Sequence, residues 1–177
     1  KTGVWEIWKA RIPWLLLLMI SATFTGMIIT SFESALASYV VLTAYIPMLM
    51  DTGGNSGSQS SVTIIRGLSL GEITFGDLPR VIWKEARVSV LCGVTLCAAN
   101  FVKLILFDRV SMLVAAVVCS TLVATVIVAK IVGCTLPILA KRIGFDPTVM
   151  ASPFITTIVD AISLFIYFSI ATVLLGL

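Results

Sequence analysis

Long apolar runs alternate with short polar segments along the whole chain. Four runs, at 13–32, 88–107, 112–139 and 153–177, each supply about the 20 mostly apolar residues that a helix needs to cross a membrane. A fifth run, at 35–50, is shorter and continues into a polar stretch. Because a spanning segment must satisfy its own backbone hydrogen bonds, runs of this length indicate membrane-spanning helices. The pattern therefore predicts an all-α membrane protein.

The polar stretch from Asp51 to Ser61 is rich in glycine and serine and follows the fifth run without any cluster of charges. If a helix from Tyr45 to about Leu68 crosses the bilayer, this stretch lies near mid-depth. Polar groups are tolerated there only against protein or water. We expect this helix to line a wet path and to bring the number of membrane-spanning helices to five.

Charged residues mark the ends of these predicted helices. Residues 1–12 combine tryptophans with charged residues, which is typical of the headgroup region of a membrane. We expect 1–12 to be the end of a helix that enters the membrane, and 13–177 to form one five-helix transmembrane domain. A charged segment at 66–87 is the conspicuous soluble loop, and Gly144 and Asp146 end the fourth span.

The composition excludes several classes of protein. Hydrophobic residues make up 59% of the 177 residues and charged ones 12%, against about 25% charged residues in soluble domains, so a water-soluble globule is excluded. The formal net charge of +3 is too small and too scattered for a nucleic-acid surface. The chain has no histidine, which removes Ser-His catalysis, HExxH zinc peptidases and imidazole metal ligands. The four cysteines form no CxxC pair, so we expect neither a zinc site nor a disulfide framework.

The basic residues fall mostly on one side of the predicted five-helix topology. Lys103 and Arg109 lie on the opposite side, and Lys130, near the inner end of the fourth span, is expected to snorkel to the interface. The positive-inside rule places the N-terminus in the cytoplasm and the C-terminus outside, as in a multi-pass protein of the cell inner (plasma) membrane. The residues on the cytoplasmic side are Lys1, Lys9, Arg11, Arg66, Arg80, Lys84, Arg87, Lys141 and Arg142.

Asp160 is the most informative residue, because the last span contains no Lys or Arg to pair with it. An isolated carboxylate in lipid costs about 2.5 to 3.5 kcal/mol on insertion scales, so Asp160 must face protein or water. It shares one helical stripe with Ser152, Thr156, Ser163 and Tyr167. Carboxylate and hydroxyl oxygens, without imidazole or thiolate, suit hard cations such as Mg²⁺ or Ca²⁺.

Other interpretations of Asp160 stay open on the residues alone. Asp160 and its polar neighbours could simply hydrogen-bond helix to helix. A proton-coupled carrier would also use such a carboxylate, with saturable and pH-coupled transport. An interaction subunit would tolerate Asp160→Asn with no change of ion flux.

The string Asp51-Thr52-Gly53 matches the DTG motif of aspartic peptidases, of which a homodimer would supply two copies. That motif works in a β-rich lobe, whereas here it lies between apolar helical runs, so the chain is not predicted to be an enzyme. Asn55 and Gln59 are four residues apart and would share one helix face, which directs two amide groups toward a lumen or a neighbouring helix.

Two widely separated parts of the sequence resemble one known family. Residues 49–59, LMDTGGNSGSQ, and 65–73, IRGLSLGEI, look like the second-helix signature of the MgtE family of magnesium channels. The region from Asp146 to Asp160 resembles the last transmembrane helix of that family, and 11–33 resembles its first. The resemblance covers essentially the whole chain.

The resemblance implies a homodimer with its pore between the two copies, and Mg²⁺ as the transported ion and ligand. It places Asp160 at the ion site and the backbone carbonyl of Thr156 against the hydrated ion. Asn55 and Ser152 are implied to line the pore. Asp146 completes the set of metal-site candidates, although its place before a proline also fits a solvated helix cap.

Members of this family usually carry cytosolic N-terminal and CBS domains that sense Mg²⁺ and close the pore, and these are the further partners that the resemblance implies. Those domains are absent from the 177 residues, so we expect the chain to be the isolated pore domain. The resulting prediction is a Mg²⁺-selective channel or transporter, with a dimeric pore and a carboxylate site for hydrated divalent cations.

Overall fold

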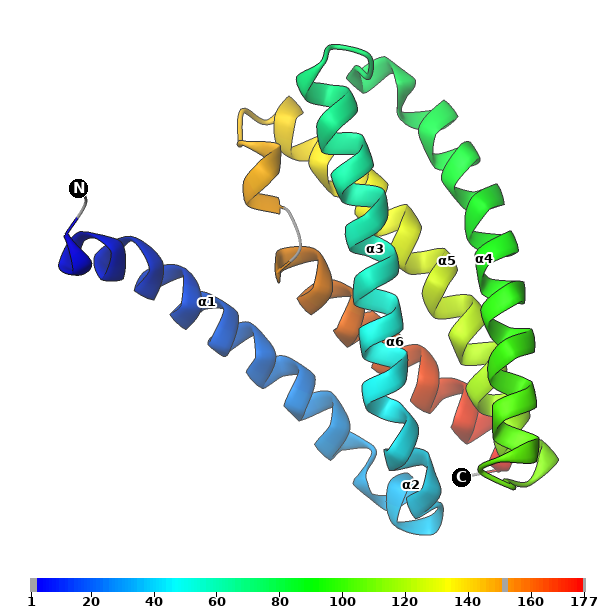
Figure 1. The fold of residues 1–177 in the computed structure, drawn as a ribbon. Helices are drawn as coiled ribbons and strands as arrows, with labels where there is room; N and C mark the ends of the chain where they lie inside the picture. Colours follow the sequence, from blue (N-terminus) through cyan, green and yellow to red (C-terminus); the bar gives the residue numbers. More distant parts are fainter. Residues whose placement is uncertain (1–2, 151–152, 177) are drawn as a thin grey trace.

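The computed structural model describes residues 3–150 and 153–176, and it is built from helices (Figure 1). No strand occurs among the described residues, which agrees with the all-α prediction. The helices in chain order, with 3-10 helices marked η, are α1 Val4–Ser31, α2 Glu33–Ser38, η1 Val40–Tyr45, α3 Ile46–Ser69, η2 Phe75–Asp77, α4 Leu78–Leu106, α5 Met112–Arg142, η3 Pro147–Met150 and α6 Pro153–Leu175.

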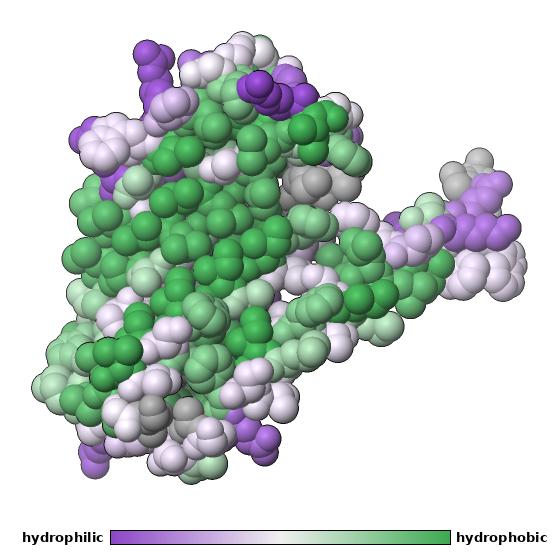
Figure 2. All heavy atoms as spheres, turned by 180° about the vertical axis from the view of Figure 1, so that it is seen from behind, coloured by the Kyte–Doolittle hydropathy of each residue, from purple (hydrophilic) through white to green (hydrophobic). Residues whose placement is uncertain are grey.

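Four helical segments in the described part of the chain are long and apolar enough to cross a membrane. They are α1, α5, α6 and Phe75–Leu106, which joins η2 to α4. The polar residues from Asp51 to Ser61 keep α3 out of this set, although its 24 residues reach about 36 Å and the hydrocarbon core is about 30 Å thick. Figure 2 shows a broad hydrophobic band across the back of the bundle, with hydrophilic groups at both ends. The protein is therefore a multi-pass membrane protein.

Prolines and a serine begin the helices that follow connecting segments. Pro47 and Pro79 lie in the first turns of α3 and α4, where a missing backbone N–H leaves no hydrogen bond unmade. The Ser111 hydroxyl accepts the Val114 N–H at 3.3 Å and caps α5. The charged loop predicted at 66–87 is shorter than expected, because α4 begins at Leu78 and includes its second half.

Glycines end α3 and α5. Gly71 has φ of 72° and Gly144 has φ of 84°, the left-handed region that favours glycine. After α5, the Phe145 N–H donates to the Ala140 carbonyl at 2.9 Å, which satisfies one of the last carbonyls of the helix. The predicted end of the fourth span at Gly144 is thus confirmed.

Pro13 lies inside α1, whereas the sequence predicted that the first span begins there. The helix begins at Val4, because the Glu6 carboxylate accepts the Gly3 N–H at 3.2 Å and closes the first turn upstream of the proline. A proline within a membrane helix is tolerated where neighbouring groups satisfy the carbonyl that it frees. Residues 4–12 are therefore continuous with the first span.

The helix α5 forms the centre of the bundle and packs against α3, α4 and α6 (Figure 1). In contrast, α1 contacts mainly α6, where Trp14 stacks on Phe154 with ring centroids 6.2 Å apart. The N-terminal part of α1 leans away from the other helices (Figure 1), and Thr25 is its buried residue. One copy of the chain therefore leaves most of α1 uncovered by protein.

Glycines allow α3 and α5 to approach each other closely. A Cβ on Gly133 of α5 would collide with the backbone of Gly57 on α3. A Cβ on Gly53 would meet the Thr125 side chain at 2.7 Å. Small residues at such crossings are typical of membrane helix pairs, and here they hold the polar middle of α3 against the centre of the bundle.

Candidate functional site

A cavity of about 430 Å³ lies between α3 and α6 and contains two acidic residues, Asp51 and Asp160. Asn55 of α3 and Thr156 of α6 also line it. Carboxylate, amide and hydroxyl groups from two helices therefore share one space. The other lining residues are Ile46, Pro47, Met50 and Gly54.

The packing of α6 determines which of its residues reach this cavity. Ile155 and Val159 are fully buried in an apolar cluster with Ala129 of α5. A Cβ on Gly54 would meet the Thr156 side chain at 2.9 Å, so α3 and α6 touch at this level. Asp160 follows Thr156 by about one turn and is half-buried at the cavity wall.

The polar stripe predicted on α6 divides between two environments. Thr156 and Asp160 line the cavity, but Ser163 and Tyr167 are buried among the helices. The Ser163 hydroxyl donates to a carbonyl of its own helix at 2.6 Å, and the Tyr167 hydroxyl donates to the Leu42 carbonyl at 2.9 Å. The C-terminal part of the stripe therefore packs within the bundle, and its N-terminal part lines the cavity.

Of the two remaining predicted site residues, the structure describes only Asp146, which is not among the residues that line this cavity. Asp146 is exposed after α5 and accepts the Thr148 N–H at 2.9 Å, which holds the pKa of Asp146 below its usual range. That geometry is an Asx turn, as expected for a carboxylate that stabilises a turn. Ser152 lies outside the described residues.

Asp51 is a cavity residue that was not among the predicted metal-site residues, although it belongs to the polar stretch 51–61 that was expected to line a wet path. Its carboxylate had been interpreted only through the peptidase-like string. That string lies within α3, so no β-rich lobe surrounds it. Asp51 precedes Asn55 by about one turn, and its charge interacts with that of Asp160. The regular spacing of Asp51, Asn55 and Gln59 is the sequence signal that could have identified it.

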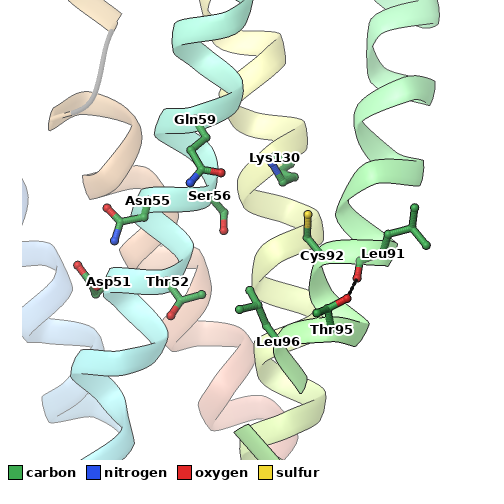
Figure 3. Close-up of a pocket in the computed structure, with 10 residues that line it drawn as sticks. All are labelled: Asp51, Thr52, Asn55, Ser56, Gln59, Leu91, Cys92, Thr95, Leu96 and Lys130. Atoms are coloured by element: carbon green, nitrogen blue, oxygen red, sulfur yellow. Dashed lines mark hydrogen bonds between the residues drawn. The ribbon is translucent and has the colours of Figure 1, made fainter. Parts of the chain in front are cut away.

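A second cavity, of about 520 Å³, lies between α3 and α4. Figure 3 shows Asp51, Asn55 and Gln59 along one edge of α3, with Lys130 on the neighbouring α5. Asp51 and Asn55 line both cavities. The other residues around the second cavity are Thr52, Ser56, Leu91, Cys92, Thr95 and Leu96.

Lys130 does not snorkel to the interface as predicted. Its side chain is only 6% exposed, and its ammonium group donates to the Ser60 hydroxyl of α3 at 3.4 Å. That hydroxyl in turn donates to the Glu85 carboxylate of α4 at 2.6 Å. The helix α5 is enclosed by three helices, so the nearest polar partner of Lys130 lies on the neighbouring α3 and not at the membrane surface. Lys130, Ser60 and Glu85 thus form one chain of contacts through α5, α3 and α4.

Lys130→Met should lower the stability of the chain by about 3 kcal/mol, because it leaves the Glu85 carboxylate without the cation at the other end of this chain. The double variant Lys130→Met/Glu85→Gln should recover much of that loss. Thermal unfolding in detergent micelles measures both, and Lys84→Met, at an exposed position, is the control. A Lys130→Met melting temperature equal to that of the wild type would contradict this account.

Comparison with known proteins agrees with this architecture. A family model described as MgtE, divalent cation transporter, matches residues 46–170, from the start of α3 into α6. A magnesium transporter MgtE of Thermus thermophilus is 38% identical over 175 residues, which cover 99% of this chain and 38% of the relative. One of Bacillus subtilis is 37% identical over 162 residues, which cover 92% and 36%. The chain spans less than two fifths of the length of these curated relatives.

The matched residues include all those that line the cavity with Asp51 and Asp160. The relatives are transporters, so the peptidase interpretation of Asp51 is set aside and the protein is not an enzyme. The helical architecture, the polar α3 and the match over most of the sequence lead to the same conclusion. The chain belongs to the MgtE family of divalent cation transporters.

Proposed function

We propose that the protein carries Mg²⁺ across the membrane through a pore formed by two copies of the chain, with α3 and α6 lining the path. The observation that carries the proposal is the Asp160 carboxylate, which lines a cavity together with an amide, a hydroxyl and a second carboxylate. The names of the relatives, magnesium transporters, support Mg²⁺ as the ion.

The chemistry of the cavity suits a hydrated divalent cation. Mg²⁺ gives up its waters reluctantly and is usually held by one or two carboxylates through those waters. Two-fold symmetry would turn one Asp160 into two facing carboxylates. At a separation of about 8 Å and an effective dielectric constant near 20, their repulsion is about 2 kcal/mol, which a divalent ion more than offsets. A monovalent ion gains less.

In the proposed assembly α3 is the fifth membrane crossing. Its polar middle is compatible with the membrane because it faces α5, α6 and the cavities instead of lipid. The excess of basic residues on one side of this topology supports an N-terminus in the cytoplasm and a C-terminus outside the inner (plasma) membrane. Cytosolic N-terminal and CBS domains, as in full-length members of the family, would join the pore on the cytoplasmic side.

The direct test is Mg²⁺ influx into liposomes that contain the chain and a trapped Mg²⁺ indicator. Influx should exceed that of protein-free liposomes and should not depend on a proton gradient. A strict dependence on the proton gradient would identify a carrier and would contradict the channel-like path proposed here.

Asn55→Cys, in a background without the native cysteines, should react with a water-soluble thiol reagent, because α3 exposes this position to the two cavities. Modification should reduce Mg²⁺ influx by blocking the path. Met19→Cys, on the apolar and exposed surface of α1, is the matched control and should stay unreactive in liposomes. Full protection of Cys at position 55 in a conducting protein would contradict the proposed lining.

A further inference from the structure

We propose that Asp51 supplies a second carboxylate to the ion site and sets its affinity for divalent cations. This inference rests on the proposed function, because it assumes that the cavity between α3 and α6 holds the ion. It assigns a role in specificity to a residue of α3, in addition to the aspartate of α6.

The first support is geometric. Asp51 and Asp160 come from different helices and line the same cavity, as do Asn55 and Thr156. Asp51 and Asn55 follow each other along one edge of α3 (Figure 3). A Cβ on Gly54 would meet the Thr156 side chain at 2.9 Å, so the two helices that carry the carboxylates touch at this level.

The second support is electrostatic. The charges of Asp51 and Asp160 interact across the cavity, and the described residues form no ion pair with either carboxylate. Lys130 also faces α3, but its ammonium group contacts Ser60, which lies nine residues after Asp51, or about 13 Å along the helix axis. The Glu85 carboxylate accepts a hydrogen bond from that same serine. The charge of Lys130 therefore has a carboxylate near it, at the level of Ser60.

Two carboxylates held in one membrane cavity without a cationic side chain repel each other and attract cations. The attraction grows with the charge of the ion, so a divalent cation gains twice as much from each carboxylate as a monovalent one. Asp51 should therefore contribute mainly to the affinity of the site for divalent ions. Asp160, half-buried and deeper in the bundle, should be needed for transport itself.

The test measures initial Mg²⁺ influx into liposomes as a function of Mg²⁺ concentration. Asp51→Asn should raise the half-saturating concentration about tenfold and leave the maximal rate within about twofold of the wild type. Asp51→Glu, which keeps the charge, should restore a half-saturating concentration within about twofold of the wild type. Glu72→Gln removes a carboxylate from the exposed segment after α3 and should change neither quantity.

The outcomes separate this inference from the function on which it rests. Wild-type half-saturation in Asp51→Asn, with gel filtration showing a folded protein, would overturn the role of Asp51 while leaving the ion site intact. Undiminished influx in Asp160→Asn would instead overturn the ion site as a whole. Asp51→Ser is the second variant should Asp51→Asn not fold, and it must show the same rise in half-saturation.

Discussion

Asp160→Asn should abolish Mg²⁺ influx, to below about a tenth of the wild-type rate, while the chain stays folded. The amide keeps the shape and the hydrogen-bonding capacity of the side chain but removes its charge. The fold should tolerate the change, because an unpaired carboxylate in a membrane span costs about 2.5 to 3.5 kcal/mol and does not stabilise the protein. Asp160→Ala should abolish influx in the same way.

The experiment reconstitutes the wild type, Asp160→Asn and Asp160→Ala at equal protein content and compares their Mg²⁺ influx. Gel filtration and melting temperature establish that each variant is folded and has the oligomeric state of the wild type. Glu33→Gln, an exposed residue at the start of α2, is the charge-removal control. Wild-type influx and selectivity in a folded Asp160→Asn protein would favour the alternative in which Asp160 only joins helices.

Gly133→Leu should prevent the bundle from assembling, and Gly133→Ala should destabilise it by about 3 kcal/mol or more. Even a single Cβ on Gly133 would collide with the carbonyl of Gly57, and backbone cannot move aside as a flexible side chain can. The helices α3 and α5 would have to separate, and α3 carries Asp51 and Asn55. We therefore expect transport to be lost together with stability.

Gly26→Ala is the matched control, because it also replaces a glycine inside a membrane helix by alanine but meets no atom within 4 Å. Alanine is the better helix former, so this variant should be neutral or slightly stabilising. Melting temperature in detergent and gel filtration measure both effects. Gly133→Ala with the melting temperature of Gly26→Ala would show that α3 and α5 do not approach as closely as described.

The positions of the apolar helices follow from the sequence alone. The predicted spans 88–107, 112–139 and 153–177 lie within or closely match α4, α5 and α6. Hydropathy is a property of each residue, and a membrane helix makes its hydrogen bonds within itself, so a long apolar run is enough to predict such a helix. Asp160 could be selected for the same reason, since a carboxylate in such a run is conspicuous without any knowledge of its neighbours.

The ends of the helices were predicted less well, because they depend on local capping and not on hydropathy. Glu6 starts α1 before Pro13, and α4 begins within the segment that was expected to be a charged loop. For the polar α3 the difficulty is its composition and not its ends. It forms a continuous helix, although composition alone does not distinguish it as a membrane span.

Only the tertiary structure decided which residues meet. Helical spacing places Asp51 and Asn55 on one edge, and Lys130 on a helix that is apolar nearly all round, but it does not say which neighbour covers each side. The close contact of glycines at 57 and 133 orients α3. That orientation places Asp51 in one cavity with Asp160 and encloses Lys130 beside Ser60. A contact between two helices far apart in the chain depends on the shapes of both helix surfaces. The residue pattern along one helix describes only the surface of that helix.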